Sequence, residues 1–361
     1  MGPIILSIVF LFLFSVFIYD RFIQKKHIIT KHFPVIGHFR YILEMIGPEM
    51  RQYFVAQNRE ELPFNRIQRS YIYASAKQEN NSQGFGSDAD FNKAGNFFIK
   101  HAGFSYRKES DKPKDYLVPN KIIGAKRKYP YKPTSIINIS GMSYGALGSG
   151  ATTANNKGAK IAGCYHNTGE GGFSKYHANG ADVVFQIGTA YYGCRDDKGA
   201  FSMDVLADLI QANPCIKMIE VKLSQGAKPG KGGILPAEKV TPEIAAIRKA
   251  PVGVASISPG FHTQFSNIDE LIAFIERVAE KTGLPVGIKS AVGQSDFWVE
   301  LATKMAANDI GPDFITIDGG EGGTGAAPSA FADHVSLPFD SAFTTVYKIF
   351  NDKNICDKIT F

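Results

Sequence analysis

The 361-residue sequence predicts an α/β protein whose second half contains a parallel β-sheet. Beyond about residue 136, short apolar runs alternate with helical stretches, a pattern typical of parallel β/α units. Several of these runs lead directly into a glycine-bearing or polar loop. The composition, with 44% hydrophobic and 20% charged residues, is that of a globular chain and excludes wholesale disorder.

We expect a strand at each apolar run, and helices between the runs. The expected strands cover residues 136–140, 162–166, 218–223, 286–289 and 314–318, and residues 359–361 open a further one. Residues 265–283 predict an amphipathic helix, because apolar residues recur there every three or four positions until Gly283 and Pro285 end the pattern. Ser295 starts another helix. One such helix cannot cover a parallel sheet, so the strands either close on themselves or are covered on both faces.

The N-terminus predicts a membrane anchor. No charged side chain occurs from Pro3 to Tyr19, and these 17 residues reach about 26 Å as a helix, the short end of a bilayer span. The run lacks the positive start and small final residues of a cleaved signal peptide. Positive side chains follow it at once, which predicts a single span with the large C-terminal part in the cytoplasm.

The two parts of the chain differ in net charge. Residues 1–135 carry 21 Lys or Arg and 11 Asp or Glu, whereas residues 136–361 carry 19 and 23. We therefore expect an anchor at 1–20, a juxtamembrane region at 21–134 with short helices at 32–70 and a polar loop at 77–96, and the α/β domain at 135–361. The four cysteines show no paired spacing, which predicts neither a disulfide scaffold nor a metal site. No nucleic-acid partner is expected.

The excess of glycine, 36 residues in all, is concentrated in loops that follow the expected strands. In a parallel barrel these strand ends share one mouth. Glycines there let the backbone approach a ring or phosphate and leave N–H groups free for anionic oxygen, which predicts a large anionic cofactor. These loops cover residues 140–143, 167–172, 224–233, 289–290 and 318–325.

Other interpretations of these loops stay open. Residues 320–325 match the dinucleotide-binding pattern G-x-G-x-x-G and follow a strand, although Ala-Ala-Pro just beyond them is a poor start for the required helix. Each loop could also be only a tight turn. Lys289 ends an apolar strand and would point into the mouth, where an anion should face it. Lys228 and Arg248 could bind substrate carboxylates or be surface charges, and Glu170 could act on substrate or merely accept hydrogen bonds from its turn.

The sequence resembles the FMN-binding synthase domain of glutamate synthases, and most closely the stand-alone, membrane-anchored members that lack the glutaminase domain. The resemblance rests on Asn-Thr-Gly-Glu-Gly-Gly at 167–172, Gln-Gly-Ala-Lys-Pro-Gly-Lys-Gly-Gly-Ile-Leu-Pro at 225–236, Ser258-Pro259 with His262, and Asp-Gly-Gly-Glu-Gly-Gly-Thr-Gly-Ala-Ala-Pro at 318–328. Residues 32–40 and 46–53 resemble the subgroup's preamble. The similarity spans roughly residues 32–361.

This resemblance implies an FMN-binding (β/α)8 barrel of the TIM type that reductively aminates 2-oxoglutarate to glutamate through reduced flavin. It implies that Glu170, Lys228 and Arg248 bind or act on the 2-oxo acid. It also implies that Lys289 reaches the polar edge of the flavin. The residues it assigns to the cofactor are Ser140, Gly141, Met142, Ser143, Asn167, Thr168, Gln225, Lys289, Asp318, Gly319, Gly320, Gly323, Thr324 and Gly325.

The sequence departs from the family pattern in three respects. Ile234 stands where the family has a substrate-binding Gln. We expect no amidotransferase domain, so ammonia is expected to be free or supplied by a partner, and electrons to come from a donor protein or an NAD(P)H-linked reductase. Five strands and the start of a sixth predict an incomplete barrel and a truncated sequence, and the family's iron–sulfur cysteines are absent. A non-catalytic, membrane-anchored flavin-binding protein and an NAD-dependent Rossmann enzyme remain the alternatives.

Overall fold

A computed structural model describes most of the chain, which forms two compact units. The units are Met1–Ser105 and Tyr106–Phe361. The described residues are 2–55, 60–80, 82, 84, 86–87, 89–93, 98–101, 103–104 and 121–361. Part of the polar loop expected at 77–96 lies outside these ranges, as does much of the region expected to connect it to the α/β domain.

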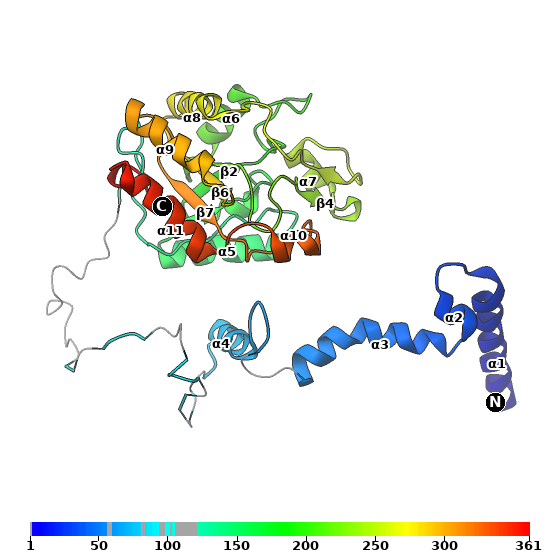
Figure 1. The fold of residues 1–361 in the computed structure, drawn as a ribbon. Coiled ribbons are helices and arrows are strands. Elements are labelled where there is room, and N and C mark those ends of the chain that lie inside the picture. Colours follow the sequence, from blue (N-terminus) through cyan, green and yellow to red (C-terminus); the bar gives the residue numbers. More distant parts are fainter. Residues whose placement is uncertain are drawn as a thin grey trace. The chain divides into compact units, whose positions relative to one another are not determined.

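The first unit is built of helices (Figure 1). They are α1 (Gly2–Ile18), a π-helical turn (Tyr19–Ile23), α2 (Ile28–His32), α3 (Gly37–Met50), a second π-helical turn (Arg51–Val55) and α4 (Arg66–Lys77). The helix from Gly2 to Ile23 is long and apolar enough to cross a membrane. Helix α4 starts where the Asn65 side chain accepts the Gln68 N–H while the Gln68 side chain accepts the Asn65 N–H, a reciprocal cap.

The second unit contains a parallel sheet that curls as part of a barrel, as the sequence predicts. Its order is β1-β2-β3-β6-β7, with single parallel bridges extending it at both edges, Ile139 beside His166 and Phe314 beside Thr360. The strands are β1 (His166–Asn167), β2 (Val183–Ile187), β3 (Ile216–Lys222), β6 (Val286–Ala291) and β7 (Ile315–Asp318). The strands β4 (Ile234–Leu235) and β5 (Ser256–Ile257) form a separate antiparallel pair.

α-Helices precede β1, follow β7 and lie in the connections from β2 to β3, β3 to β6 and β6 to β7, since parallel strands need crossover connections. They are α5 (Ser149–Ala162), α6 (Met203–Ala212), α7 (Pro242–Arg248), α8 (Ile268–Thr282), α9 (Asp296–Asn308), α10 (Ser329–His334) and α11 (Phe339–Asp352). The helix expected at 265–283 is α8, and the helix expected after Ser295 is α9. Gly283 at φ 74° ends α8, in the left-handed conformation that glycine adopts without strain.

Two strand predictions were wrong in detail. The run at 162–166 is mostly not a strand, because α5 continues to Ala162 and is ended by Gly163 at φ 68°, so that β1 begins only at His166. Residues 136–140 contribute a single bridge instead of a strand, whereas Thr360 forms a parallel bridge where a further strand was expected to open. The sequence reading also missed β2, all five of whose residues are buried, including the polar Gln186.

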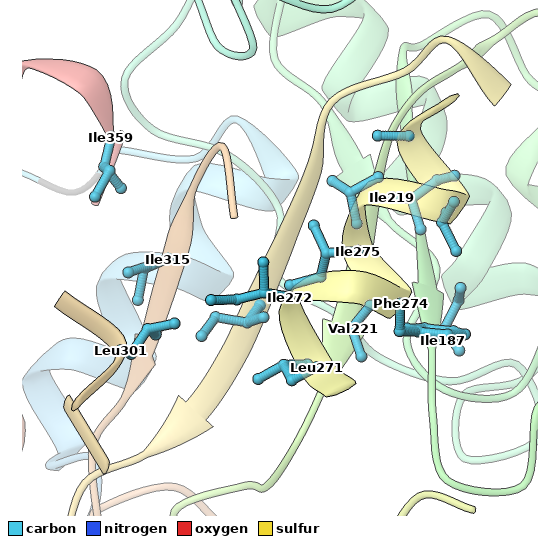
Figure 2. Packing of buried hydrophobic residues seen from close by; sticks show 14 of the residues in the cluster. Ile187, Ile219, Val221, Leu271, Ile272, Phe274, Ile275, Leu301, Ile315 and Ile359 are labelled. Carbon is cyan, nitrogen blue, oxygen red and sulfur yellow. The ribbon is translucent and has the colours of Figure 1, made fainter. Parts of the chain in front are cut away.

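The core lies between the strands and the helices that cover them (Figure 2). Leu271, Phe274 and Ile275 of α8 are at most 2% exposed and pack in one cluster with strand residues such as Ile219. Burying each such side chain stabilises the fold by about 1.5–3 kcal/mol. The predicted apolar stripe of α8 is therefore the face that closes one side of the sheet.

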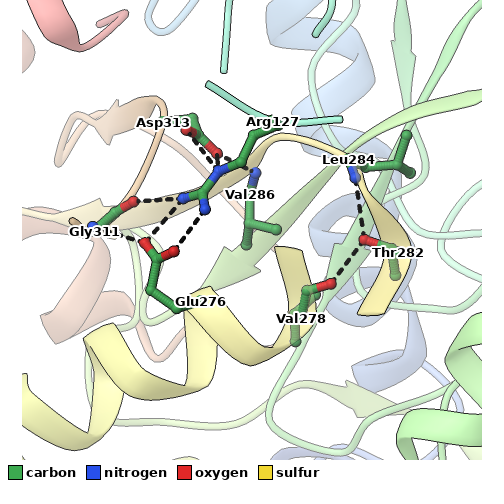
Figure 3. Close-up of polar contacts among 8 residues, drawn as sticks. All are labelled: Arg127, Glu276, Val278, Thr282, Leu284, Val286, Gly311 and Asp313. Carbon is green, nitrogen blue, oxygen red and sulfur yellow. Dashed lines mark hydrogen bonds and ion pairs between the residues drawn. The ribbon is translucent and has the colours of Figure 1, made fainter. Parts of the chain in front are cut away.

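Arg127 ties the segment before the barrel to the strand starts (Figure 3). Its Nε donates to both oxygens of Asp313 at 3.0 and 2.9 Å, and its Nη1 and Nη2 donate to Glu276 at 2.6 and 2.9 Å. Asp313 also accepts the N–H of Val286 at 2.8 Å. These pairs, above all the one with Glu276, raise the pKa of Arg127. One guanidinium thus joins a loop, a helix and the start of β6.

Candidate functional site

Loops from distant parts of the sequence meet at the carboxyl ends of the strands. A Cβ added at Gly226 would lie 1.8 Å from the carbonyl oxygen of Gly319, and one at Gly169 would lie 2.5 Å from the N atom of Ser143. Real Cβ atoms essentially never come this close, so these positions require glycine for close backbone approach. The predicted glycine loops therefore share one mouth.

A cavity of about 240 Å³ opens at this mouth. Its wall includes the charged residues Glu170, Lys228 and Arg248 and the apolar residues Met142, Leu147 and Ile234. The remaining lining residues are Gly141, Ser143, Ala146, Gln186, Tyr192, Lys222, Gln225, Gly233, Leu235, Ser258, Gly323, Thr324, Gly325 and Ala326.

Glu170 lies between two lysines at the cavity wall. Its Oε1 is 3.0 Å from Lys222 Nζ and 3.6 Å from Lys228 Nζ. Burial alone would raise the pKa of Glu170, but the two ammonium groups outweigh burial and hold that pKa below its usual value. Burial lowers the pKa of Lys228, whose residue is only 3% exposed. Glu170 is consequently a carboxylate at neutral pH, and a poor proton donor.

Arg248, at the end of α7, is held by the backbone and by an aromatic ring. Its Nη1 donates to Ser256 Oγ at 3.3 Å and its Nη2 to the carbonyl of Tyr144 at 3.2 Å. The guanidinium lies over the ring of Tyr192, 4.8 Å from its centroid, a cation–π arrangement. Its Nε is buried and has no hydrogen-bond partner among the described residues. Burial lowers the pKa of Arg248.

A second buried carboxylate, Glu220 of β3, organises the floor of the mouth. It accepts hydrogen bonds from Asn167 Nδ2 at 2.9 Å, Gln186 Nε2 at 2.6 Å and Thr316 Oγ1 at 2.6 Å. The Asn167 and Gln186 side chains face Gly141, where an added Cβ would lie 2.8 and 2.9 Å from their polar atoms. Glu220 therefore sets the positions of the two amides on which the Gly141 backbone rests.

Lys289 lies in β6, apart from the cavity lining but within the same cluster of loops. Its Nζ is 3.6 Å from Asp318 Oδ1, and Asp318 Oδ2 accepts the N–H of Gly226 at 3.0 Å. The lysine is therefore linked through Asp318 to Gly226, in the loop at 224–233. An anion faces Lys289, as expected of a lysine at the end of an apolar strand, and this anion is Asp318 of the same chain.

The structure brings ten of the expected site residues to the cavity wall. They are Gly141, Met142, Ser143, Glu170, Gln225, Lys228, Arg248, Gly323, Thr324 and Gly325. The others lie around it. Asn167 and Thr168 are buried beneath the wall, Ser140 is exposed, Lys289 pairs with Asp318, and Gly319 and Gly320 approach Phe339 and Ser336. Their roles in binding remain predictions.

Four residues of the site were not predicted from the sequence. Lys222, Gln186 and Tyr192 line the cavity, and Glu220 lies beneath the lining, where it accepts a hydrogen bond from Gln186. Lys222 carries the same signal that drew attention to Lys289, a lysine at the end of an apolar strand. Gln186 and Tyr192 belong to the missed β2 and the loop that follows it. A buried acid within an apolar strand, as at Glu220, is itself a signal, because burial of a charge requires hydrogen-bond partners.

Residues 320–325, which match a dinucleotide-binding pattern, do not open a helix. They remain in loop and turn structure, and α10 begins only at Ser329, after Pro328, and is six residues long. In the Rossmann arrangement the helix N-terminus faces the pyrophosphate directly after the glycines. The structure gives this interpretation no support. Across the described part of the chain, no three His, Cys, Asp or Glu side chains gather as a metal-binding group.

Comparison with known proteins gives the same family at both the domain and the whole-chain level. Residues 105–361 match a family described as a conserved region in glutamate synthase. The chain is 38% identical over 359 residues to the glutamate synthase large subunit-like protein YerD of Bacillus subtilis, covering 90% of this chain and 68% of that protein.

Two further relatives match the barrel region. The archaeal-type glutamate synthase [NADPH] of Thermotoga sp. is 35% identical over 224 residues, covering 61% of this chain and 40% of that protein. The archaeal glutamate synthase [NADPH] of Methanocaldococcus jannaschii is 35% identical over 230 residues, covering 62% and 41%. The chain thus spans about two thirds of the length of the Bacillus relative and two fifths of the length of these two.

Proposed function

The chain belongs to the glutamate synthase family, whose named members are oxidoreductases, and on this premise we propose that its barrel is an FMN-dependent enzyme that aminates 2-oxoglutarate to glutamate. Ammonia is free or delivered by a partner. Electrons come from a donor protein or from an NAD(P)H-linked reductase, in keeping with the NADPH named for the archaeal relatives.

The net positive charge of the side chains that line the cavity is the main support for this proposal. Lys222, Lys228 and Arg248 face a space in which Glu170 is the one opposing carboxylate among the lining residues. The wall therefore has a surplus of two positive charges, which matches the two carboxylates of a 2-oxo dicarboxylic acid. Buried cations of this kind gain most from an anion that satisfies them directly. Arg248, with its planar fork, suits one carboxylate, and the two lysines suit the other.

The glycine loops fit a flavin with a phosphate tail. Gly141, Gly323 and Gly325 present backbone without side chains at the cavity, so that a flat ring can approach and N–H groups can meet phosphate oxygen. Residues 140–143 and 323–325 would hold the group. FMN, when bound, supplies the redox chemistry of the reaction. Lys289 and Asp318 would keep the glycine segment in place beside it.

We also propose that α1 anchors the enzyme in a membrane as a single span, with the barrel on the cytoplasmic side. The helix is apolar on every face, its large side chains are exposed, and Arg21, Lys25, Lys26 and Lys31 follow it. Alkaline extraction of cell membranes tests this proposal. The full chain should remain in the membrane pellet, and its release into the supernatant would contradict the anchor.

The function is tested with the full chain, purified in detergent and titrated with FMN. We expect quenching of flavin fluorescence, and glutamate formation from 2-oxoglutarate and ammonia when a chemical reductant supplies electrons. Lys228→Met and Arg248→Met should each raise the 2-oxoglutarate concentration needed, while the FMN titration stays unchanged. Lys239→Met, an exposed lysine on the neighbouring turn, is the matched control. A folded chain that binds no FMN, or binds nicotinamide in its place, would overturn the proposal.

A further inference from the structure

We propose that α3 (Gly37–Met50) is a second membrane-contacting element, which lies in the surface of an anionic bilayer with its apolar stripe among the acyl chains. This inference rests on the proposed anchor α1 and extends it, because an in-plane helix would restrain the unit on the membrane surface in addition to tethering it there.

The stripe on α3 is continuous, and the described residues of the first unit leave it exposed. Phe39, Ile42, Leu43, Ile46 and Met50 recur at spacings of three or four, so they share one face of the helix. Their exposed fractions are 65, 47, 64, 40 and 49%. The charged residues Arg40 and Glu44 form an ion pair at 2.8 Å on the other side of the helix. Such an arrangement suits the boundary between water and lipid.

A buried carboxylate holds the start of α3 at the end of α1. Asp20, which is 1% exposed, accepts the N–H of Val35 at 2.9 Å, and His38 Nε2 lies 3.0 and 2.9 Å from its two oxygens. Gln24 reinforces the turn by donating to the carbonyls of Asp20 and His27 and to Thr30 Oγ1. A span formed by α1 ends at the lipid–water boundary, so the contacts of Asp20 place the start of α3 at that depth.

The direction of α3 and the positive charge of the residues around it agree with a position in the membrane surface. In Figure 1, α3 runs crosswise to α1 and does not continue it, as expected of a helix lying in the plane that α1 crosses. Residues 20–51 contain six Lys or Arg and three Asp or Glu. Basic residues near an anionic surface each contribute about 1 kcal/mol of attraction. Anionic lipid is therefore the occupant that complements both the stripe and its charged surroundings.

The experiment places single tryptophans on the full chain in vesicles of phosphatidylglycerol and phosphatidylcholine, with one lipid brominated at a time. Leu43→Trp probes the stripe, Glu44→Trp is the matched control on the next residue and the opposite side, and Phe10→Trp reports on the anchor. The chain has one native tryptophan, Trp298, which is buried, and its emission is subtracted with the unsubstituted chain.

We expect Leu43→Trp and Phe10→Trp to lose emission to brominated lipid, with Leu43→Trp more strongly quenched by brominated phosphatidylglycerol than by brominated phosphatidylcholine, and Glu44→Trp to keep its emission. Quenching of Phe10→Trp without quenching of Leu43→Trp would overturn this inference and leave the anchor intact, since α3 would then pack on protein or face water. Equal quenching of Leu43→Trp by the two lipids would overturn the preference for anionic lipid. An unquenched Phe10→Trp would overturn the anchor and this inference together.

Discussion

At the scale of single residues, the mouth of the barrel depends on glycines, whose lack of a side chain lets the backbones of two loops come into contact. Gly226 and Gly319 approach so closely that no side chain fits between their backbones, and Asp318 then accepts the Gly226 N–H. Two loops that follow different strands are joined in this way. The same contact orients Asp318 toward Lys289.

Gly226→Ala should therefore separate these loops. Its Cβ would meet the Gly319 carbonyl oxygen, and such overpacking typically costs about 1–3 kcal/mol. We expect a lower urea midpoint and weaker FMN binding in a fluorescence titration. Gly293→Ala, in an exposed loop after β6 with no atom within 4 Å of the added Cβ, is the matched control and should leave both unchanged. Equal behaviour of the two variants would refute the close approach.

Arg248 depends on a neighbour outside the cavity. Glu243 accepts hydrogen bonds from Tyr144 Oη at 2.6 Å and Tyr176 Oη at 3.2 Å, and pairs with Lys175 at 3.0 Å. These contacts, led by the one from Tyr144, lower the pKa of Glu243. The Tyr144 carbonyl in turn accepts from Arg248. Glu243 is thus a positioning residue for the guanidinium.

We expect Glu243→Ala to raise the 2-oxoglutarate concentration needed for half-maximal rate, because Tyr144 loses its anchor and Arg248 its fixed acceptor. Steady-state kinetics and an FMN titration on the same preparation measure this, and flavin affinity should not change. Glu238→Ala, an exposed acid on the preceding turn, serves for comparison. An unaltered substrate requirement in Glu243→Ala would exclude the positioning role.

At the scale of elements, a segment that precedes the barrel in sequence packs against the end of the barrel where its strands begin. The bridge between Ile123 and Tyr131 closes a short turn, and Arg127 in that turn pairs with Glu276 of α8 and with Asp313 before β7. The side chains of Arg127 and Asp313 are 16% and 12% exposed. At the end opposite the loops, such contacts act on stability.

Arg127→Met should lower the free energy of unfolding by on the order of 3 kcal/mol, because two largely buried carboxylates lose their partner. Urea denaturation followed by circular dichroism measures the change. Lys304→Met removes a pair with the exposed carboxylate of Asp269 at 2.7 Å and should cost at most about 1 kcal/mol. If the two substitutions cost the same, the Arg127 cluster contributes no more than a surface ion pair.

Prediction of elements succeeded where local patterning was strong. Helix α8 has its apolar face spaced for a helix and a glycine at its end, and it was predicted to within a few residues. The strand β2 was missed, because Gln186 interrupts its apolar run. Only the fold supplies the Glu220 carboxylate that makes a buried Gln186 acceptable. The ends of α5 and β1 shifted for a similar reason, since an apolar run can continue a helix as well as start a strand.

At the scale of the whole molecule, buried histidines make stability depend on pH. His166 and His177 are fully buried, and burial lowers the pKa of each to about 4 from 6.5. Burial also lowers the pKa of His262. Between pH 6.5 and 4, His166 and His177 bind protons in the unfolded chain but not in the folded chain. Their contribution to the free energy of unfolding is therefore complete above pH 6.5 and is lost as the pH falls through this range.

We expect the free energy of unfolding to fall by at most about 1.4 kcal/mol per pH unit for each of His166 and His177 as the medium is acidified from pH 6.5 toward 4. Urea midpoints measured across this range test the slope. His177→Gln keeps an acceptor for the Ser174 N–H and should make the slope shallower, whereas His334→Gln, at an exposed position, should not. A flat profile in the unsubstituted chain would contradict the burial of these groups.

The gathering of the candidate residues at one end of the sheet could be predicted from the sequence, while their roles stay predictions. Parallel strands end at one edge, so the residues after them must gather there, and Glu170, Lys228 and Arg248 do meet at one cavity. The sequence could not predict which of the gathered charged side chains form ion pairs with one another. That Glu170 would lie nearer Lys222 than Lys228, and that Lys289 would face Asp318, depends on strand register and side-chain packing.

The sequence by itself determined the α/β class, the apolar N-terminal helix, the glycine loops and the family, because periodicity, composition and motifs are local properties of the chain. The tertiary structure alone decided which charges neutralise one another, which leave a surplus in the cavity, and which buried acid, Glu220, supports the floor. The physical reason is that a charge acquires its environment only when segments far apart in the chain exclude water together.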